Sequence, residues 1–308
     1  MRGELVQLQL DNVVEYANRW SEAVPSDSRP YIYQARVFQT QYQLRESRDA
    51  LLQAVDRRPD SGWAWVQLSF AQVIMREFED ALVAARKAID LLEVNGQAHV
   101  AAAIALRELG RDDEARTHLE QALAIPDDAL RRYYILVGER PEDVDVSAYA
   151  QLGELEMDSD RPSEALAAFE EVLKRQPLNK SALNGKSQAL RQLGRRDEAR
   201  ELAQQVADIT VASSRVESLG NQIAATPDDV ETQRQLAVEM LRFFDNQTGL
   251  YWADQALEAN PSDRLVLTAL VDFYRDRSDA PDAAAQAARY EKRLEAAGGR
   301  LEPGDETQ

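Results

Sequence analysis

The segment LRELGRDDEAR at residues 106–116 occurs a second time, as LRQLGRRDEAR at residues 190–200. Nine of the eleven positions are identical, although 84 residues separate the two copies. In each copy a glycine, Gly110 or Gly194, follows a leucine-rich stretch and precedes acidic residues. Glycine adopts the left-handed conformation that ends a helix, and acidic residues favour a helix N-terminus. Each copy therefore predicts a turn between two helices, and the recurrence predicts an internal repeat.

Small and apolar residues give the length of this repeat. They recur in three columns, and in each column the successive steps are 34, 34, 50, 34, 50 and 34 residues. The columns are Ala35, Ser69, Ala103, Gly153, Ser187, Ala237 and Val271; Ser47, Ala81, Ala115, Ala165, Ala199, Gly249 and Ala283; and Ala54, Ala88, Ala122, Val172, Val206, Ala256 and Tyr290. A 50-residue step equals one repeat plus 16 residues, so we predict seven units with two inserts.

Within one unit the apolar residues have the spacing of a helix. Residues 63–76 and 79–92 each carry apolar side chains at intervals of three and four. Proline follows the second helix in several units, at Pro59, Pro177 and Pro261, and stops it. One such pair cannot bury its apolar face alone. We therefore expect the pairs to stack, with small residues where the two helices of a pair cross.

Composition agrees with an all-helical protein and limits its partners. The 308 residues are 44% hydrophobic, rich in helix-forming Ala, Leu, Glu, Arg and Gln, and contain no cysteine. The absence of cysteine excludes disulfides and thiol catalysis. A formal net charge of −18 disfavours nucleic acid, which is bound mainly through Lys and Arg, and disfavours an anionic membrane surface. We expect neither nucleic-acid binding nor direct membrane binding.

The repeat resembles the tetratricopeptide repeat, a 34-residue helix pair with small residues at fixed positions and a closing proline. The resemblance is carried by YAQLGEL at 149–155, EALAAFEEVLKRQP at 164–177 and QALEANP at 255–261. Some units depart from the pattern: Glu93 stands where proline is usual, and Gly249 and Tyr290 replace alanine. The resemblance implies an all-α, right-handed superhelical solenoid of antiparallel helix pairs.

The predicted domain organisation follows from this register. Residues 1–27 form an N-terminal capping partial repeat, and the polar tail 298–308 is disordered. Three units lie in 28–129, two in 146–213 and two in 230–297. The inserts 130–145 and 214–229 each add or lengthen a helix and change the direction of the superhelix; a plain loop is the alternative.

No constellation of residues predicts catalysis. The two histidines, His99 and His118, lie on different predicted helices, and packed or solvated histidines are commoner than ligands or bases. Nucleotide-binding, zinc-protease and nucleophile-elbow motifs do not occur. We expect no enzyme, cofactor or metal site. The N-terminal segment lacks the features of a signal peptide, which predicts a cytoplasmic protein, although a removed leader or anchor would give the same sequence.

Binding is the favoured function. The resemblance implies that the first helix of each unit lines a concave groove, which holds a peptide or a partner helix. The predicted partner-binding residues are Arg29, Tyr33, Arg36, Trp63, Gln67, Phe70, Ile74, Ile104, Arg107, Gln188 and Arg191. The same predicted face also includes Ile32, Val66, Val73, Gln97, Val100, Glu154, Asp158, Asn184, Arg234, Arg242, Asp272 and Arg275. Trp63, Phe70 and Tyr33 are candidate anchors. The alternative for the helix that carries Trp63 and Phe70 is that neighbouring units, or the N-terminal segment, cover it.

A structural role is the runner-up. Repeat arrays of this kind can self-associate or form part of an envelope or secretion assembly. The last predicted helix, within residues 282–298, alternates alanine with charged residues, which indicates a solvated cap and hence a monomer. Helical repeats that bind RNA need a basic groove, and the acidity of the chain argues against one.

Overall fold

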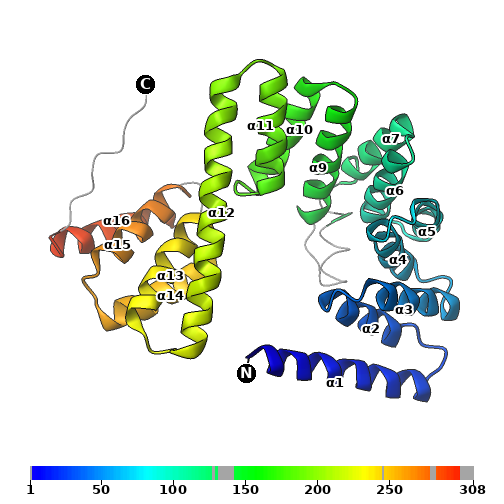
Figure 1. The fold of residues 1–308 in the computed structure, drawn as a ribbon, viewed down its shortest axis with the longest axis horizontal. Helices are drawn as coiled ribbons and strands as arrows, with labels where there is room; N and C mark the ends of the chain where they lie inside the picture. The colour runs from blue at the N-terminus through cyan, green and yellow to red at the C-terminus, as the bar shows by residue number, and fades with distance from the viewer. Residues whose placement is uncertain (1, 127–128, 131–141, 245, 278–281, 299–308) are drawn as a thin grey trace. The chain divides into compact units, whose positions relative to one another are not determined.

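The computed structural model describes residues 2–126, 129–130, 142–244, 246–277 and 282–298. Within these ranges the regular structure is entirely α-helical, which confirms the predicted fold class of helix pairs joined by short turns (Figure 1). The helices are α1 (Arg2–Ala23), α2 (Arg29–Thr40), α3 (Leu44–Arg57), α4 (Gly62–Ile74), α5 (Phe78–Leu91), α6 (Gly96–Glu108), α7 (Asp112–Leu123), α9 (Glu142–Asp158), α10 (Pro162–Arg175), α11 (Lys180–Gln192), α12 (Arg196–Ala225), α13 (Val230–Phe243), α14 (Asn246–Ala259), α15 (Arg264–Arg275) and α16 (Ala283–Ala296).

The chain divides into two compact units, residues 1–202 and 203–308, with the boundary inside α12. In the first unit, α2 packs on α3, α4 on α5, α6 on α7 and α9 on α10. Each pair also contacts the next pair along the chain. In the second unit, α13 packs on α14 and α15 on α16. The core of each unit is therefore built from nearest-neighbour contacts, as in other helical repeats.

Small side chains allow the helices of each pair to approach closely. Every member of the first two predicted columns is buried, from Ala35 and Ser47 in the first pair to Val271 and Ala283 in the last. Two serines of the first column find backbone partners within the interior. The hydroxyl of Ser69 donates to the carbonyl of Val66 at 2.7 Å, and that of Ser187 donates to the carbonyl of Ala199 at 2.9 Å. Small size explains why these positions recur, and the hydrogen bonds explain why serine is tolerated at positions 69 and 187.

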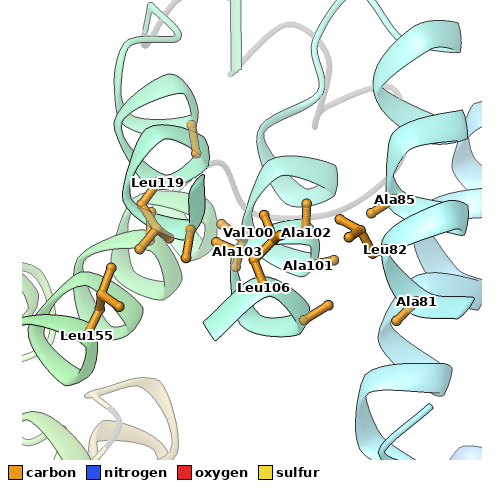
Figure 2. Packing of buried hydrophobic residues seen from close by; sticks show 14 residues of the cluster. Ala81, Leu82, Ala85, Val100, Ala101, Ala102, Ala103, Leu106, Leu119 and Leu155 are labelled. Carbon is orange, nitrogen blue, oxygen red and sulfur yellow. The ribbon is translucent and has the colours of Figure 1, made fainter. Parts of the chain in front are cut away.

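Larger side chains fill the space between pairs. Figure 2 shows one cluster, in which Leu82 of α5, Leu106 of α6, Leu119 of α7 and Leu155 of α9 surround the alanines of α6. Three of these leucines, Leu106, Leu119 and Leu155, are almost completely inaccessible to solvent. The cluster spans three consecutive pairs, so the stack has a continuous interior there.

The five turns between paired helices of the first unit share one backbone motif. The second residue after each first helix has a positive φ: 57° at Tyr42, 62° at Arg76, 72° at Gly110, 54° at Asp160 and 79° at Gly194. After each one, the next amide donates to a carbonyl five residues back, as in the Arg111 N to Leu106 O bond of 2.9 Å. This is the Schellman motif, and it stops the first helix at the same register each time.

The stack continues across the first insert. Residues 131–141 lie outside the described residues, but α9 packs directly on α6 and α7. Glu156 of α9 is buried and accepts from Arg116 of α7 at 2.9 Å, and it also pairs with Arg161 at 2.6 Å. At the edge of the insert, buried Leu130 and Val144 pack together. The helices before and after the insert therefore pack directly against each other, and we call this interface the joint between α7 and α9.

The helix α12 is 30 residues long and extends through most of the second insert, ending at Ala225. In the first unit, Ala199 and Leu202 of α12 pack with Leu190. In the second unit, Leu219 and Ile223 of α12 pack with Leu236 of α13. The two ends of one helix thus belong to two different hydrophobic cores.

The N-terminal segment forms the 22-residue helix α1, which packs on α2. The side-chain amide of Gln34 donates to Asn18 Oδ1 at 2.7 Å, and the ring of Trp20 lies 6.1 Å from that of Tyr33. The tail that we predict to be disordered lies, apart from Gly298, outside the described residues. Among the helices that the structure describes, none is both long enough and apolar enough to cross a membrane.

Candidate functional site

The predicted binding residues differ in exposure. Those that face solvent are Arg29, Tyr33, Arg36, Ile74, Gln188 and Arg191. Those that are half-buried are Trp63, Gln67, Phe70, Ile104 and Arg107. No single site within the described residues brings the whole set together, so the set divides into local groups that follow the helices.

The aromatic anchors predicted on α4 contribute to packing. Trp63 packs against a cluster of Val66, Ala88 and Ala98. Phe70 packs against this cluster and against the larger one around α6. Trp63 and Phe70 therefore have a structural role in packing. Part of each side chain remains accessible, so their role in binding stays a prediction.

A second group lies where α1 meets α2. The guanidinium of Arg29 lies 4.9 Å from the centre of the Trp20 ring, and Trp20 contacts Tyr33. Arg29 also donates two hydrogen bonds to Asp27, and these bonds hold the pKa of that carboxyl below its ordinary value. Arg29 and Tyr33 therefore help to fasten the first helix to the stack.

Of the remaining predicted residues, the structure brings only Arg107 and Gln188 together, in a pocket of about 450 Å³. The pocket lining does not include Arg36, Gln67, Ile74, Ile104 or Arg191. Its lining comes from the first helices of three consecutive pairs, α6, α9 and α11, and from α10. The lining residues are Arg107, Glu154, Met157, Asp158, Phe169, Ser181, Asn184, Gly185 and Gln188. Sequence reasoning placed Arg107, Glu154, Asp158, Asn184 and Gln188 on this face. It missed Met157, Phe169, Ser181 and Gly185.

Two glycines shape the floor of this pocket. A Cβ atom on Gly185 of α11 would lie 2.3 Å from Cζ of Phe169, and one on Gly153 of α9 would lie 2.6 Å from its Cε1. Both distances are shorter than real carbon contacts. The absence of side chains at Gly153 and Gly185 thus allows the Phe169 ring to lie between α9 and α11, under the pocket.

The charged rim of the pocket is organised around Arg107. Its guanidinium forms an ion pair with Glu154, lies 3.6 Å from Glu108 and lies 4.0 Å from Asp158. The Arg107 side chain is 17% exposed, whereas that of Asp158 is 64% exposed. The charged residues of the lining, Arg107, Glu154 and Asp158, carry a formal charge of −1, and Glu108, outside the lining, also pairs with Arg76 at 3.4 Å. The rim is therefore acidic, with Asp158 as its most accessible carboxylate.

The polar side chains of α11 complete the rim. Ser181, Asn184 and Gln188 are exposed and line the pocket. Within the described part of the chain, no hydrogen-bond partner contacts these three side chains. Arg191 is one turn further along α11 and lies outside the lining. The pocket thus offers amide donors and acceptors to a ligand.

The second unit has a smaller pocket of about 310 Å³, lined by Arg215, Arg234, Gln235, Val238, Glu239 and Leu265. Its two arginines are already paired, Arg215 with Glu239 and Arg234 with Glu231. This pocket contains none of the eleven predicted partner-binding residues, whereas the pocket between α6, α9 and α11 contains Arg107 and Gln188 and is the better candidate for a binding site.

The two histidines contact each other instead of this pocket. His99 of α6 and His118 of α7 have their Nδ1 atoms 2.8 Å apart. Burial lowers the pKa of both groups, and that of His99 falls to about 4. Among the described residues, no group of three or more potential metal ligands surrounds a common point. The histidine pair is thus part of the packing between α6 and α7.

Comparisons with known proteins agree with this architecture. Two family models of the tetratricopeptide repeat match residues 102–125 and 151–212. PilW, a widely conserved type IV pilus biogenesis factor, has a similar structure at 15% identity with a TM-score of 0.54, over 67% of this chain and 88% of that one. The Cut9–Hcn1 hetero-tetramer of APC/C matches at 14% identity with a TM-score of 0.50, over 91% of this chain and 46% of that one.

YrrB, a TPR protein with an unusual peptide-binding site, matches at 18% identity with a TM-score of 0.45, over 63% of this chain and 92% of that one. At these identities the likeness concerns the fold. A comparison with curated proteins finds no match.

The stacked helix pairs, the 34-residue register and the shared face of first helices define a helical-repeat protein. More specifically, residues 102–125 and 151–212 match tetratricopeptide-repeat models, and the fold is that of a tetratricopeptide-repeat protein. Repeats of this family generally serve as non-catalytic modules for protein interaction, so the fold supports an interaction scaffold in general.

Proposed function

We propose that this chain is a non-enzymatic adaptor that holds an extended segment of a partner protein in the pocket between α6, α9 and α11. One observation carries the proposal: the lining residues come from the first helices of three consecutive pairs and meet in one hollow of about 450 Å³. Pockets of roughly 300–1,000 Å³ are typical of binding sites, and this one suits one or two side chains of a peptide.

The spacing of the exposed amides favours an extended segment. Asn184 and Gln188 are four residues apart on α11, so they lie on one face about 6 Å apart along the axis. An extended chain repeats about every 6.8 Å over two residues. Side-chain amides at this spacing can therefore donate to and accept from alternate peptide groups of a bound segment, which recognises its backbone.

The chemistry of the lining supports binding without catalysis. Its carboxylates surround Arg107, and its other polar groups are two amides and one hydroxyl. The histidines, which are the usual general bases at neutral pH, lie elsewhere and bond to each other. Nothing in the described lining provides a nucleophile activated by a base.

A peptide-display selection against the whole chain tests the proposal. Selected peptides are measured for affinity against the wild type, against Asn184→Trp, which fills the pocket, and against Gln121→Trp. Gln121 is exposed on α7 and does not line the pocket, so it is the matched control. We expect the affinity to fall at least tenfold for Asn184→Trp and to stay within twofold for Gln121→Trp.

Equal affinity of the selected peptides for both variants would place the binding site elsewhere and contradict the proposal. Light scattering on the same samples tests the structural alternative. A concentration-dependent increase in mass, together with a selection that yields no specific peptide, would favour a self-associating scaffold instead.

A further inference from the structure

The pocket combines an apolar floor with an acidic rim. This inference rests on the proposed function, because it concerns the ligand of the same pocket. The floor consists of the Phe169 ring, the Met157 side chain and the bare backbone of Gly185. The rim carries Glu154 and Asp158. A ligand that fits both parts needs an apolar stem and a polar or charged tip.

The sign of that charge follows from the groups already present. Arg107 is the only cation in the described lining, and it is held by Glu108, Glu154 and Asp158. The lining holds two carboxylates, Glu154 and Asp158, for this one guanidinium, whereas Glu108 lies outside the lining and also pairs with Arg76. A second cation therefore lowers the electrostatic energy of the rim, and a ligand carboxylate raises it. Asp158 is the carboxylate most available to a ligand, since it is 64% exposed and lies 4.0 Å from Arg107.

The rest of the molecule acts in the same direction. The chain carries a formal charge of −18, so its field draws basic segments toward the surface and repels acidic ones. Lysine and arginine combine a stem of three or four methylene groups with a cationic head, and they bury the stem along apolar surfaces while the head stays near charge or water.

We propose that the pocket takes a lysine or arginine side chain from the bound segment. The stem lies over Phe169, Met157 and Gly185, and the head meets Asp158 and Glu154. Asn184 and Gln188 hold the adjacent backbone. Recognition of this kind makes the adaptor selective for basic segments of its partner.

Nuclear magnetic resonance tests this assignment with two small probes. They are Nα-acetyl-lysine-N-methylamide and its norleucine counterpart, which keeps the stem and lacks the charge. The measurement is the change in position of the side-chain amide signals of Asn184 and Gln188 during titration. We expect the lysine probe to bind at least fivefold more tightly than the norleucine probe.

Two carboxylate variants make the test specific. Asp158→Asn removes the accessible charge of the rim and should remove most of the preference for lysine. Asp113→Asn removes the same charge from α7, where the Asp113 side chain is fully exposed, and should leave the preference intact. Circular dichroism of both variants checks that the helices are unchanged.

The results separate this inference from the proposed function. If the norleucine probe binds as tightly as the lysine probe, or if Asp158→Asn keeps the full preference, the lysine assignment is wrong and the peptide pocket stands. If neither probe moves the Asn184 and Gln188 signals, the lysine assignment is likewise overturned. The proposed function fails only if, in addition, the display-selected peptides ignore the Asn184→Trp change.

Discussion

The Nδ1 atoms of His99 and His118 lie 2.8 Å apart, so one imidazole donates and the other accepts across the α6–α7 interface. This hydrogen bond requires that at least one ring nitrogen be unprotonated. Burial lowers the pKa of both groups. The positive charge of the other histidine contributes at His99 and that of Arg86 at His118, where Glu114 acts in the opposite direction. The pair is therefore stable in its neutral form.

Acid should weaken the first unit through this pair. A histidine whose pKa is lower in the folded state binds its proton more tightly in the unfolded chain, so protonation favours unfolding. Stability falls as pH drops below the ordinary pKa of 6.5, and for His99 the fall continues until pH passes its folded pKa of about 4. We expect a loss of about 2–3 kcal/mol, because a lowered pKa costs about 1.4 kcal/mol for each pH unit between the two values.

Urea unfolding at pH 7 and pH 4 measures this loss. Carboxylates also titrate over the range, so the informative quantity is the difference between the wild type and a His99→Gln, His118→Gln double variant. The double variant should lose clearly less stability on acidification. An equal loss in both proteins would show that the histidine pair does not contribute.

The turn at Tyr42 predicts a stabilising substitution. Tyr42 has a φ of 57° and is 89% exposed, so its side chain adds strain without packing. A residue with a Cβ atom loses about 1–2 kcal/mol in this conformation, whereas glycine does not. After the greater freedom of unfolded glycine is subtracted, Tyr42→Gly should stabilise the protein by about 0.5–1 kcal/mol. Thermal unfolding measures the effect, and Tyr42→Ala is the control because it keeps the Cβ atom. If the Tyr42→Gly variant is no more stable than the Tyr42→Ala variant, the backbone at this turn is not strained.

The buried carboxylate of Glu156 predicts a large destabilisation. Glu156→Gln leaves Arg116 and Arg161 without their shared anion at the joint between α7 and α9. Breaking a buried ion pair on one side costs about 3–5 kcal/mol, and we expect about 2–3 kcal/mol because both arginines are partly solvated. Chemical denaturation of Glu156→Gln and of Glu198→Gln tests this. Glu198 pairs with Arg195 on the surface, so its loss should have little effect, and similar effects of the two changes would contradict the prediction.

The glycines give a pair of substitutions with opposite signs. Gly185→Ala places a Cβ 2.3 Å from Phe169 and should destabilise the protein by about 1–3 kcal/mol. Gly220→Ala, in α12, meets no atom within 4 Å and should stabilise it by up to about 1 kcal/mol. Unfolding curves of both variants measure the two effects. Partial rescue of Gly185→Ala by Phe169→Leu would assign the cost to the ring, and a neutral Gly185→Ala would exclude the close contact.

Much of the fold could be predicted from the sequence because certain positions of each repeat, where the paired helices cross, accept only small residues. The columns that contain Ser69 and Ala81 are buried as the steric argument requires. Gly110 and Gly194 indicate two of the turns. The same turn at Tyr42 and Asp160 has no local signal in the sequence, because these residues adopt the left-handed conformation under the constraint of packed helices, against their own preference.

The candidate site was only partly predictable. Helical spacing identifies which residues of α6, α9 and α11 share a face. The depth of the pocket on that face depends on contacts between elements that are distant in sequence. Phe169 belongs to a second helix, and it reaches the pocket only because Gly153 and Gly185 leave room for it. Conversely, the apolar character of Trp63 and Phe70 reflects their packing as much as any binding role.

The packing of α9 against α7 does not depend on the segment of chain that links the two helices. Each helix of this joint finds its neighbour through leucines and through the Glu156–Arg116 pair, whatever the length of the chain that links them. Two polypeptides made separately on either side of it carry the same complementary surfaces. The insert is therefore a natural place to split the molecule into fragments that reassemble, or to graft a foreign sequence onto the array.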